Sequence, residues 1–123
     1  MAKTVLVVDD STSLRALVKL ALTRAGYTVI EGADGKEALA RLDQAGKVHL
    51  IVSDVNMPNM DGITFVRQVK QHPKHKFIPV IMLTTEDEQA KMQQAKAAGA
   101  RAWLIKPFNP PQLLDAVAQL ASA

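Results

Sequence analysis

The sequence predicts a doubly wound α/β sandwich, in which one parallel sheet has helices on both faces. Five short apolar runs alternate with five segments of helical periodicity, and the third run, residues 50 to 52, is apolar at successive positions. A strand that is apolar on both sides is expected where helices cover both faces of a parallel sheet. The 123 residues and 48% hydrophobic content suffice for one domain with an ordinary core.

Composition excludes several classes of protein. The chain has no cysteine, which excludes disulfides and thiolate zinc sites. The N-terminal apolar run is too short for a signal peptide, and no run reaches the roughly 18 apolar residues of a membrane span, so we expect a cytoplasmic protein without a membrane partner. The net charge of +3 lacks the clustered arginines and aromatics of a nucleic-acid surface and favours acidic protein partners.

The first two strand and helix pairs follow from local patterns. Residues 4 to 8 are the first strand, and residues 12 to 25 carry apolar side chains at helical spacing. Gly26 is expected to end that helix as a left-handed cap, before a second strand within residues 27 to 32. The stretch from Asp34 to Glu37 resembles a capping box and begins the second helix.

The third unit contains the strand around which the chain is organised. The strand at residues 49 to 53 leads to Asp54 at its exit, and a turn rich in Pro, Asn and Asp follows. A helix is then predicted from Gly62 to Gln71, because apolar residues recur at helical spacing until His72 and Pro73 end it.

The last two units complete the alternation. A strand over residues 78 to 83 leads to Thr84, and Thr85 to Glu88 has the pattern of a capping box that begins the fourth helix. Gly99 ends that helix, and the fifth strand lies within residues 100 to 105. Asn109 and Pro110 supply an N-cap and a first-turn proline for the fifth helix.

The order of the strands follows from chain length and chirality. Right-handed crossovers leave few orders for five parallel strands, and a chain of this length favours the flavodoxin-like order 2-1-3-4-5. Strands one and three are then neighbours, and Asp9 and Asp10 lie beside Asp54. Since ligand sites in such sheets lie beyond the carboxyl ends of the strands, we expect a functional site there.

The residues at these strand ends predict phosphoryl-transfer chemistry. Three converging carboxylates repel one another, and a divalent cation relieves that repulsion. Oxygen ligands of this kind suit Mg²⁺ with several waters. Lys106 adds a positive charge and Thr84 a hydroxyl, and both suit phosphoryl oxygens. The set contains an acceptor carboxylate, a metal site and two donors.

The motifs resemble those of a known family. Asp9-Asp10, the pattern D-x-x-M-P-x-M-D-G from Asp54 to Gly62, Thr84 after an apolar strand and K-P-F from Lys106 are similar to the receiver domains of two-component response regulators. The resemblance covers essentially the whole chain, with every motif in order. It is greatest to the stand-alone, CheY-like chemotaxis regulators, whose strand order is a known instance of this fold.

The resemblance implies a role for each motif residue. Asp54 is expected to accept a phosphoryl group from a CheA-like histidine kinase. Asp9, Asp10, Asp54 and the backbone carbonyl of Asn56 are expected to bind Mg²⁺, and Lys106 to contact the phosphoryl group. The family also implies a cis peptide bond between Lys106 and Pro107.

The resemblance further implies a conformational switch on phosphorylation and residues that set the lifetime of the phosphorylated state. Thr84 is expected to move toward the phosphoryl group, and the aromatic residue Trp103 to rotate inward. The output surface comprises the fourth helix, the fifth strand and the fifth helix. Asn56 and Glu86 occupy positions that flank the path of the hydrolytic water and tune dephosphorylation.

The resemblance also bears on organisation and partners. Residues 1 to 123 are expected to form a single receiver domain without an effector domain. We expect a signalling phospho-acceptor rather than an enzyme, monomeric or dimerising on activation. Its output partner is the flagellar motor switch protein or another regulator.

Two other functions stay open at this point. The first is a metal-dependent phosphatase or phosphotransferase with an aspartate nucleophile, although no loop is long enough to enclose a small substrate. The second is a flavodoxin-like cofactor binder, which is disfavoured because the first strand-to-helix turn is acidic where a phosphate-binding loop needs glycines or hydroxyls. His49, His72 and His75 are interpreted as solvated loop residues rather than a metal or nucleic-acid site.

Overall fold

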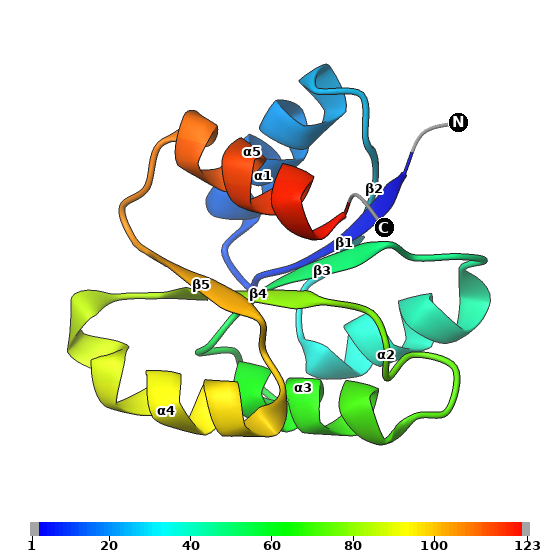
Figure 1. Cartoon of the computed structure of the whole chain (residues 1–123), viewed down its shortest axis with the longest axis vertical. Coiled ribbons are helices and arrows are strands. Elements are labelled where there is room, and N and C mark those ends of the chain that lie inside the picture. The colour runs from blue at the N-terminus through cyan, green and yellow to red at the C-terminus, as the bar shows by residue number, and fades with distance from the viewer. Residues whose placement is uncertain (1–2, 122–123) are drawn as a thin grey trace.

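A computed structural model of the chain describes residues 3–121, apart from the side chain of Glu86. The fold is a five-stranded parallel sheet in the order β2-β1-β3-β4-β5, which confirms the predicted fold class. Helices α1 and α5 cover one face of this sheet, and α2, α3 and α4 cover the other (Figure 1). Within the described part of the chain, no helix is both long and apolar enough to span a membrane.

The elements alternate along the chain as predicted. The strands are β1 (Thr4–Val8), β2 (Thr28–Gly32), β3 (Leu50–Asp54), β4 (Val80–Thr84) and β5 (Ala102–Ile105). The helices are α1 (Thr12–Arg24), α2 (Gly35–Gln44), α3 (Gly62–Gln71), α4 (Gln89–Ala98) and α5 (Pro110–Leu120), with a short 3₁₀ turn η1 (Glu86–Glu88) before α4.

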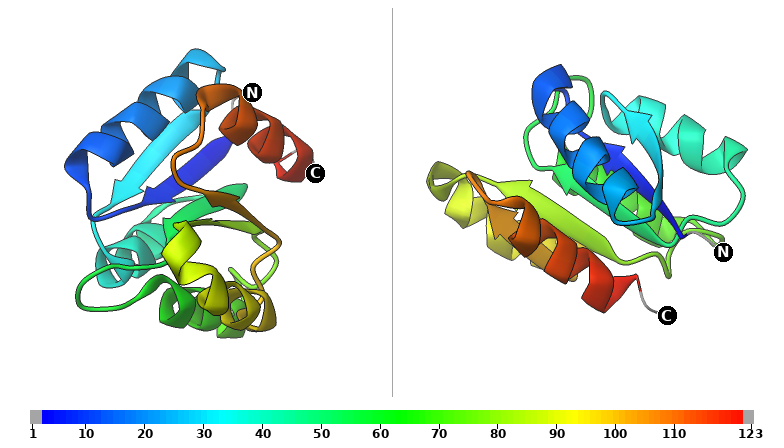
Figure 2. Two further views of the ribbon diagram at one scale, coloured as in Figure 1. Left: turned by 90° about the vertical axis from the view of Figure 1, so that its left-hand side faces the viewer. Right: turned by 90° about the horizontal axis from the view of Figure 1, so that it is seen from above.

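Two apolar cores lie on opposite faces of the sheet, because side chains alternate along each strand. Leu6, Ile51 and Met82 point into the core beneath α2, α3 and α4, where Phe65 is fully buried. Their strand neighbours face the second core, which α1 and α5 cover. The two further views in Figure 2 show these helical layers on either side of the sheet. Strand β3 is central and buried throughout, so the polar residue at its end is held by a rigid framework.

Polar N-caps explain where most helices begin. Ser11, Asp34, Asp61 and Asn109 each precede a helix and accept a hydrogen bond from a backbone N–H of its first turn. Asn109 also forms a reciprocal capping box with Gln112. These contacts satisfy amide groups that have no partner inside the helix, typically at about 1 kcal/mol each.

The expected start of the fourth helix is wrong by one turn. The carboxylate of Glu88 accepts hydrogen bonds from the backbone N–H of Thr85 and from its hydroxyl, at 2.9 and 3.0 Å. The Thr85 hydroxyl therefore donates to Glu88 and is not used as a helix cap. The pair closes the 3₁₀ turn, and α4 begins at Gln89 with no side-chain cap among the described residues.

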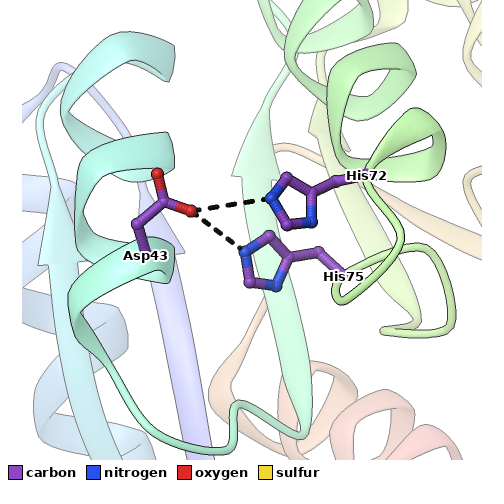
Figure 3. Close-up of side chains that lie close together, drawn as sticks. All are labelled: Asp43, His72 and His75. Carbon is purple, nitrogen blue, oxygen red and sulfur yellow. Dashed lines mark hydrogen bonds and ion pairs between the residues drawn. The ribbon is translucent and has the colours of Figure 1, made fainter.

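The interpretation of the histidines as solvated is also wrong in part. His75 is buried, and its ring stacks on that of His72 with the centroids 4.1 Å apart. Both rings face Asp43 near the end of α2 (Figure 3). His49 accepts a hydrogen bond from the backbone N–H of Thr4 through Nδ1.

Candidate functional site

Three carboxylates meet at the carboxyl ends of β1 and β3. Val8 pairs with Ser53 in the parallel register, so Asp9 and Asp54 follow at adjacent points of neighbouring strands. Asp9, Asp10 and Asp54 each place one carboxylate oxygen within 4.8 Å of the others. Asp9 and Asp54 are buried, at 1% and 6% exposure, whereas Asp10 is exposed. The sequence prediction that these three side chains converge is thereby confirmed.

Lys106 is the cation of this cluster. Its Nζ lies 3.2 Å from Oδ1 of Asp54 and 3.7 Å from Oδ2 of Asp9. The other oxygen of Asp9, Oδ1, accepts the backbone N–H of Ser11 at 2.8 Å. Oδ2 of Asp9 has no hydrogen-bond partner among the described residues. A buried carboxylate oxygen without a donor is costly, and a bound cation would satisfy it.

Burial changes the acidity of both buried carboxyls. Burial and, after it, repulsion from Asp9 raise the pKa of Asp54 from 3.8 to about 6, against the opposing charge of Lys106. Burial likewise raises the pKa of Asp9, against the Ser11 N–H and Lys106. One lysine does not compensate two carboxylates in a poorly hydrated site, so the cluster favours an additional cation.

The loop after Asp54 folds back tightly on the strand end. The N–H of Gly62 donates to the carbonyl of Val55 at 2.8 Å, which closes residues 55 to 62. A Cβ atom at Gly62 would lie 2.0 Å from the carbonyl oxygen of Asp54, so glycine is required there by close backbone approach. At the tip, Asn59 has a φ of 67° and donates through its side chain to Asp34 of the α2 cap. The loop therefore holds the Asp54 backbone in place.

Thr84 ends β4 beside this cluster. It is 1% exposed, and its hydroxyl donates to the carbonyl of Thr85 at 3.2 Å. Its own carbonyl accepts the backbone N–H of Lys106 at 2.6 Å. The peptide bond between Lys106 and Pro107 is cis, as the sequence resemblance implies.

The remaining predicted site residues are Trp103, Asn56 and Glu86. Trp103 pairs with Met82 in the sheet and packs, half-buried, against the core beneath α4. Asn56 is exposed, and its side-chain oxygen accepts a hydrogen bond from Nζ of Lys91 in α4 at 2.7 Å. The side chain of Glu86 lies outside the described residues. Lys91 is a site neighbour that the sequence analysis missed, because no local pattern marks one lysine of an exposed helix face.

Comparison with known families now decides the assignment. Residues 5–118 match the response regulator receiver domain. The chain belongs to this family. The match favours a receiver over the small-molecule phosphatase and the cofactor binder that the sequence left open.

Individual relatives of this receiver are chemotaxis proteins. It is 40% identical over 111 residues to chemotaxis protein CheY1 of Helicobacter pylori, across 89% of this chain and 90% of that protein. It is 39% identical over 111 residues to the CheY homolog of Campylobacter jejuni, across 89% and 85% respectively. Among solved structures it is similar to chemotaxis protein CheY4 of Vibrio cholerae, with 48% identity, a TM-score of 0.91 and coverage of 98% and 99%. The receiver is therefore CheY-like in both sequence and fold.

Proposed function

We propose that this receiver is a phosphorylation-controlled chemotaxis switch that accepts a phosphoryl group from a histidine kinase on Asp54. The observation that carries the proposal is the buried carboxylate of Asp54 at a strand end, with Lys106 at 3.2 Å and the carboxylates of Asp9 and Asp10 adjacent. This arrangement places a nucleophile beside one positive charge and beside two carboxylates that can hold a metal cation, and phosphoryl transfer uses both positive charges.

The donor set fits Mg²⁺. Asp9, Asp10 and Asp54 offer oxygen ligands only, and Oδ2 of the buried Asp9 lacks a hydrogen-bond donor among the described residues. These three side chains, with the backbone carbonyl of Asn56, would hold the ion. When bound, Mg²⁺ would neutralise the charge that develops on the transferred phosphoryl oxygens.

The residues of the chain perform the transfer in a simple sequence. A carboxylate oxygen of Asp54 attacks the phosphorus of a phosphohistidine, and the new O–P bond forms as the P–N bond breaks. The electron pair of that bond returns to the imidazole nitrogen of the kinase, which takes a proton from water. Lys106 stabilises the phosphoryl oxygens as a fixed positive charge. Hydrolysis by water later releases inorganic phosphate and regenerates Asp54.

The switch follows from the charge added at this edge of the sheet. Phosphorylation adds about −1.5 to −2 charges and three acceptor oxygens. The Thr84 hydroxyl, which donates to the adjacent Thr85 carbonyl at 3.2 Å, would turn to the phosphoryl group instead. Trp103 would move inward on the neighbouring strand, and the surface of α4, β5 and α5 would change its partner affinity. The partner is the flagellar motor switch protein or another regulator, and the protein acts in the cytoplasm.

Intact-mass measurement tests the acceptor. The purified protein is incubated with acetyl phosphate, with and without Mg²⁺, alongside Asp54→Asn and the exposed control Asp115→Asn. We expect one phosphoryl adduct on the wild type and on D115N, formed only with Mg²⁺, and none on D54N. An adduct of equal yield on D54N, or equal yields with and without Mg²⁺, would contradict the proposal.

A further inference from the structure

A second group of ligand-type side chains lies at the opposite end of α3 from Asp54. It consists of Asp43, His72 and His75, whose donor atoms all lie within 4.8 Å of one another. Helix α3 has 10 residues, so about 15 Å separate its two ends, and the group is distinct from the carboxylate cluster. Asp43 comes from the last turn of α2, His72 follows α3 directly, and His75 lies in the next turn.

The geometry places two nitrogens around one oxygen. Nε2 of His75 lies 3.3 Å, and Nε2 of His72 lies 3.8 Å, from the same Oδ1 of Asp43 (Figure 3). Tetrahedral ligands bound to zinc at 2.0 to 2.1 Å lie about 3.3 Å from one another. The two nitrogen-to-oxygen distances are thus already near the spacing of a metal's ligands, and side-chain rotations would complete the site.

One side chain of the group is buried and held by packing, and the other two are accessible to solvent. The side chain of His75 is only 10% exposed, whereas those of His72 and Asp43 are 39% and 66% exposed. The group borders an open hollow of about 1120 Å³. A cation can therefore enter from solvent, keep water on its open coordination positions and find one ligand already fixed by packing.

We propose that Asp43, His72 and His75 form a binding site for a divalent transition-metal ion of the zinc class. Two imidazoles and one carboxylate suit Zn²⁺, Ni²⁺ and Cu²⁺, whereas Mg²⁺ and Ca²⁺ prefer oxygen ligands alone. The bound ion joins the end of α2 to the turn after α3. It would cross-link these two segments at the end of the molecule opposite Asp54.

One hydrogen bond must change when the metal binds. The backbone N–H of Lys74 donates to Nδ1 of His72 at 3.1 Å, which places the proton of the neutral ring on Nε2. Metal binding at Nε2 moves that proton to Nδ1, so the Lys74 amide loses its acceptor and turns to water. The lysines at 47 and 74 beside the hollow also oppose a cation. Both effects weaken the site and predict reversible binding.

Zinc titration of tag-free protein by calorimetry tests the site, in excess Mg²⁺ to occupy the carboxylate cluster. We expect one Zn²⁺ per chain in the wild type. Binding should be at least about tenfold weaker in H72Q and in D43N, because even the loss of a residue that only hydrogen-bonds to a metal ligand weakens metal binding by that factor. Asp43 is exposed and His72 half-exposed, and neither belongs to the apolar core, so these variants should fold. H49Q is the matched control, because His49 borders the same hollow outside the group, and its affinity should equal that of the wild type.

Amide NMR supplies a second readout. Zinc should shift the Lys74 amide signal in the wild type and leave it unchanged in H72Q. No zinc binding by the wild type, equal affinity in H72Q and D43N, or an equal loss in H49Q would overturn the proposal. The last outcome would mean that zinc binds histidines without a defined site. None of these results depends on phosphorylation of Asp54, so the two proposals fail separately.

Discussion

Replacing Asp54 with Asn should stabilise the protein at neutral pH in the absence of Mg²⁺. Burial and repulsion from Asp9 raise the pKa of Asp54 from 3.8 to about 6, a shift of about two pH units. Each unit is worth about 1.4 kcal/mol, so ionised Asp54 lowers the free energy of unfolding by roughly 3 kcal/mol. Asn has nearly the same shape without the charge, and Lys106 keeps Asp9 as a partner at 3.7 Å.

The pH dependence gives the sign of this effect. Because the folded-state pKa of Asp54 is raised, the protonated group stabilises the fold below about pH 4, and this contribution is lost as pH rises to about 6. The free energy of unfolding of D54N should therefore exceed that of the wild type by about 3 kcal/mol near pH 7, and the difference should be close to zero near pH 4. Mg²⁺ should reduce this difference in stability at neutral pH, because the ion binds the folded wild type more tightly than it binds D54N and so stabilises the wild type more.

Urea unfolding followed by Trp103 fluorescence and circular dichroism measures this difference. D115N is the control, because Asp115 is exposed on α5 and its loss should change stability by less than about 0.5 kcal/mol. A gain in the free energy of unfolding of D54N below about 0.5 kcal/mol at neutral pH would refute the reasoning. A gain of equal size near pH 4 and near pH 7 would refute it as well.

Three further predictions concern the surroundings of Asp54. G62A should destabilise the fold by about 3 kcal/mol or more in urea unfolding, because its Cβ would lie 2.0 Å from the Asp54 carbonyl oxygen. The Cβ of G46A meets no atom of the described residues within 4 Å, so this control should change stability little. Mg²⁺ affinity, measured by calorimetry, should fall about tenfold per pH unit below about pH 6, where Asp54 takes up a proton; a flat profile would contradict the pKa assignment. K91A should shorten the lifetime of the phosphorylated protein by about two- to tenfold, the worth of one hydrogen bond, because it frees Asn56 to meet the hydrolytic water; an unchanged decay of the adduct mass would count against this.

The fold was predictable because its signals are local. Apolar runs identify the strands, Asn109 and Asp61 cap the helices that follow them, and left-handed Gly26 and Gly99 end two others. The convergence of Asp9 with Asp54 also follows from sequence, because parallel strands present their carboxyl ends at one edge of the sheet.

Other features depend on packing between elements. The Lys91 contact with Asn56 and the His75 contact with Asp43 join residues 35 and 32 positions apart, on elements whose relative rotation no local pattern specifies. Similarly, the pattern from Thr85 to Glu88 predicts a helix start, yet the same side chains close a 3₁₀ turn. The sequence pattern therefore predicted the pairing of Thr85 with Glu88 correctly, but it predicted an α-helix where the structure has a 3₁₀ turn.

Chemical mapping of the phosphoryl group tests the central claim most directly. The protein is phosphorylated with acetyl phosphate and Mg²⁺, reduced with borohydride, digested and analysed by peptide mass spectrometry. Borohydride reduces an aspartyl phosphate to homoserine and leaves free carboxylates and phosphate esters unchanged, so it marks the acceptor itself. We predict homoserine at position 54 and at no other aspartate. Homoserine at Asp9 or Asp10, or a phosphate ester on Thr84 with residue 54 unmodified, would contradict Asp54 as the acceptor.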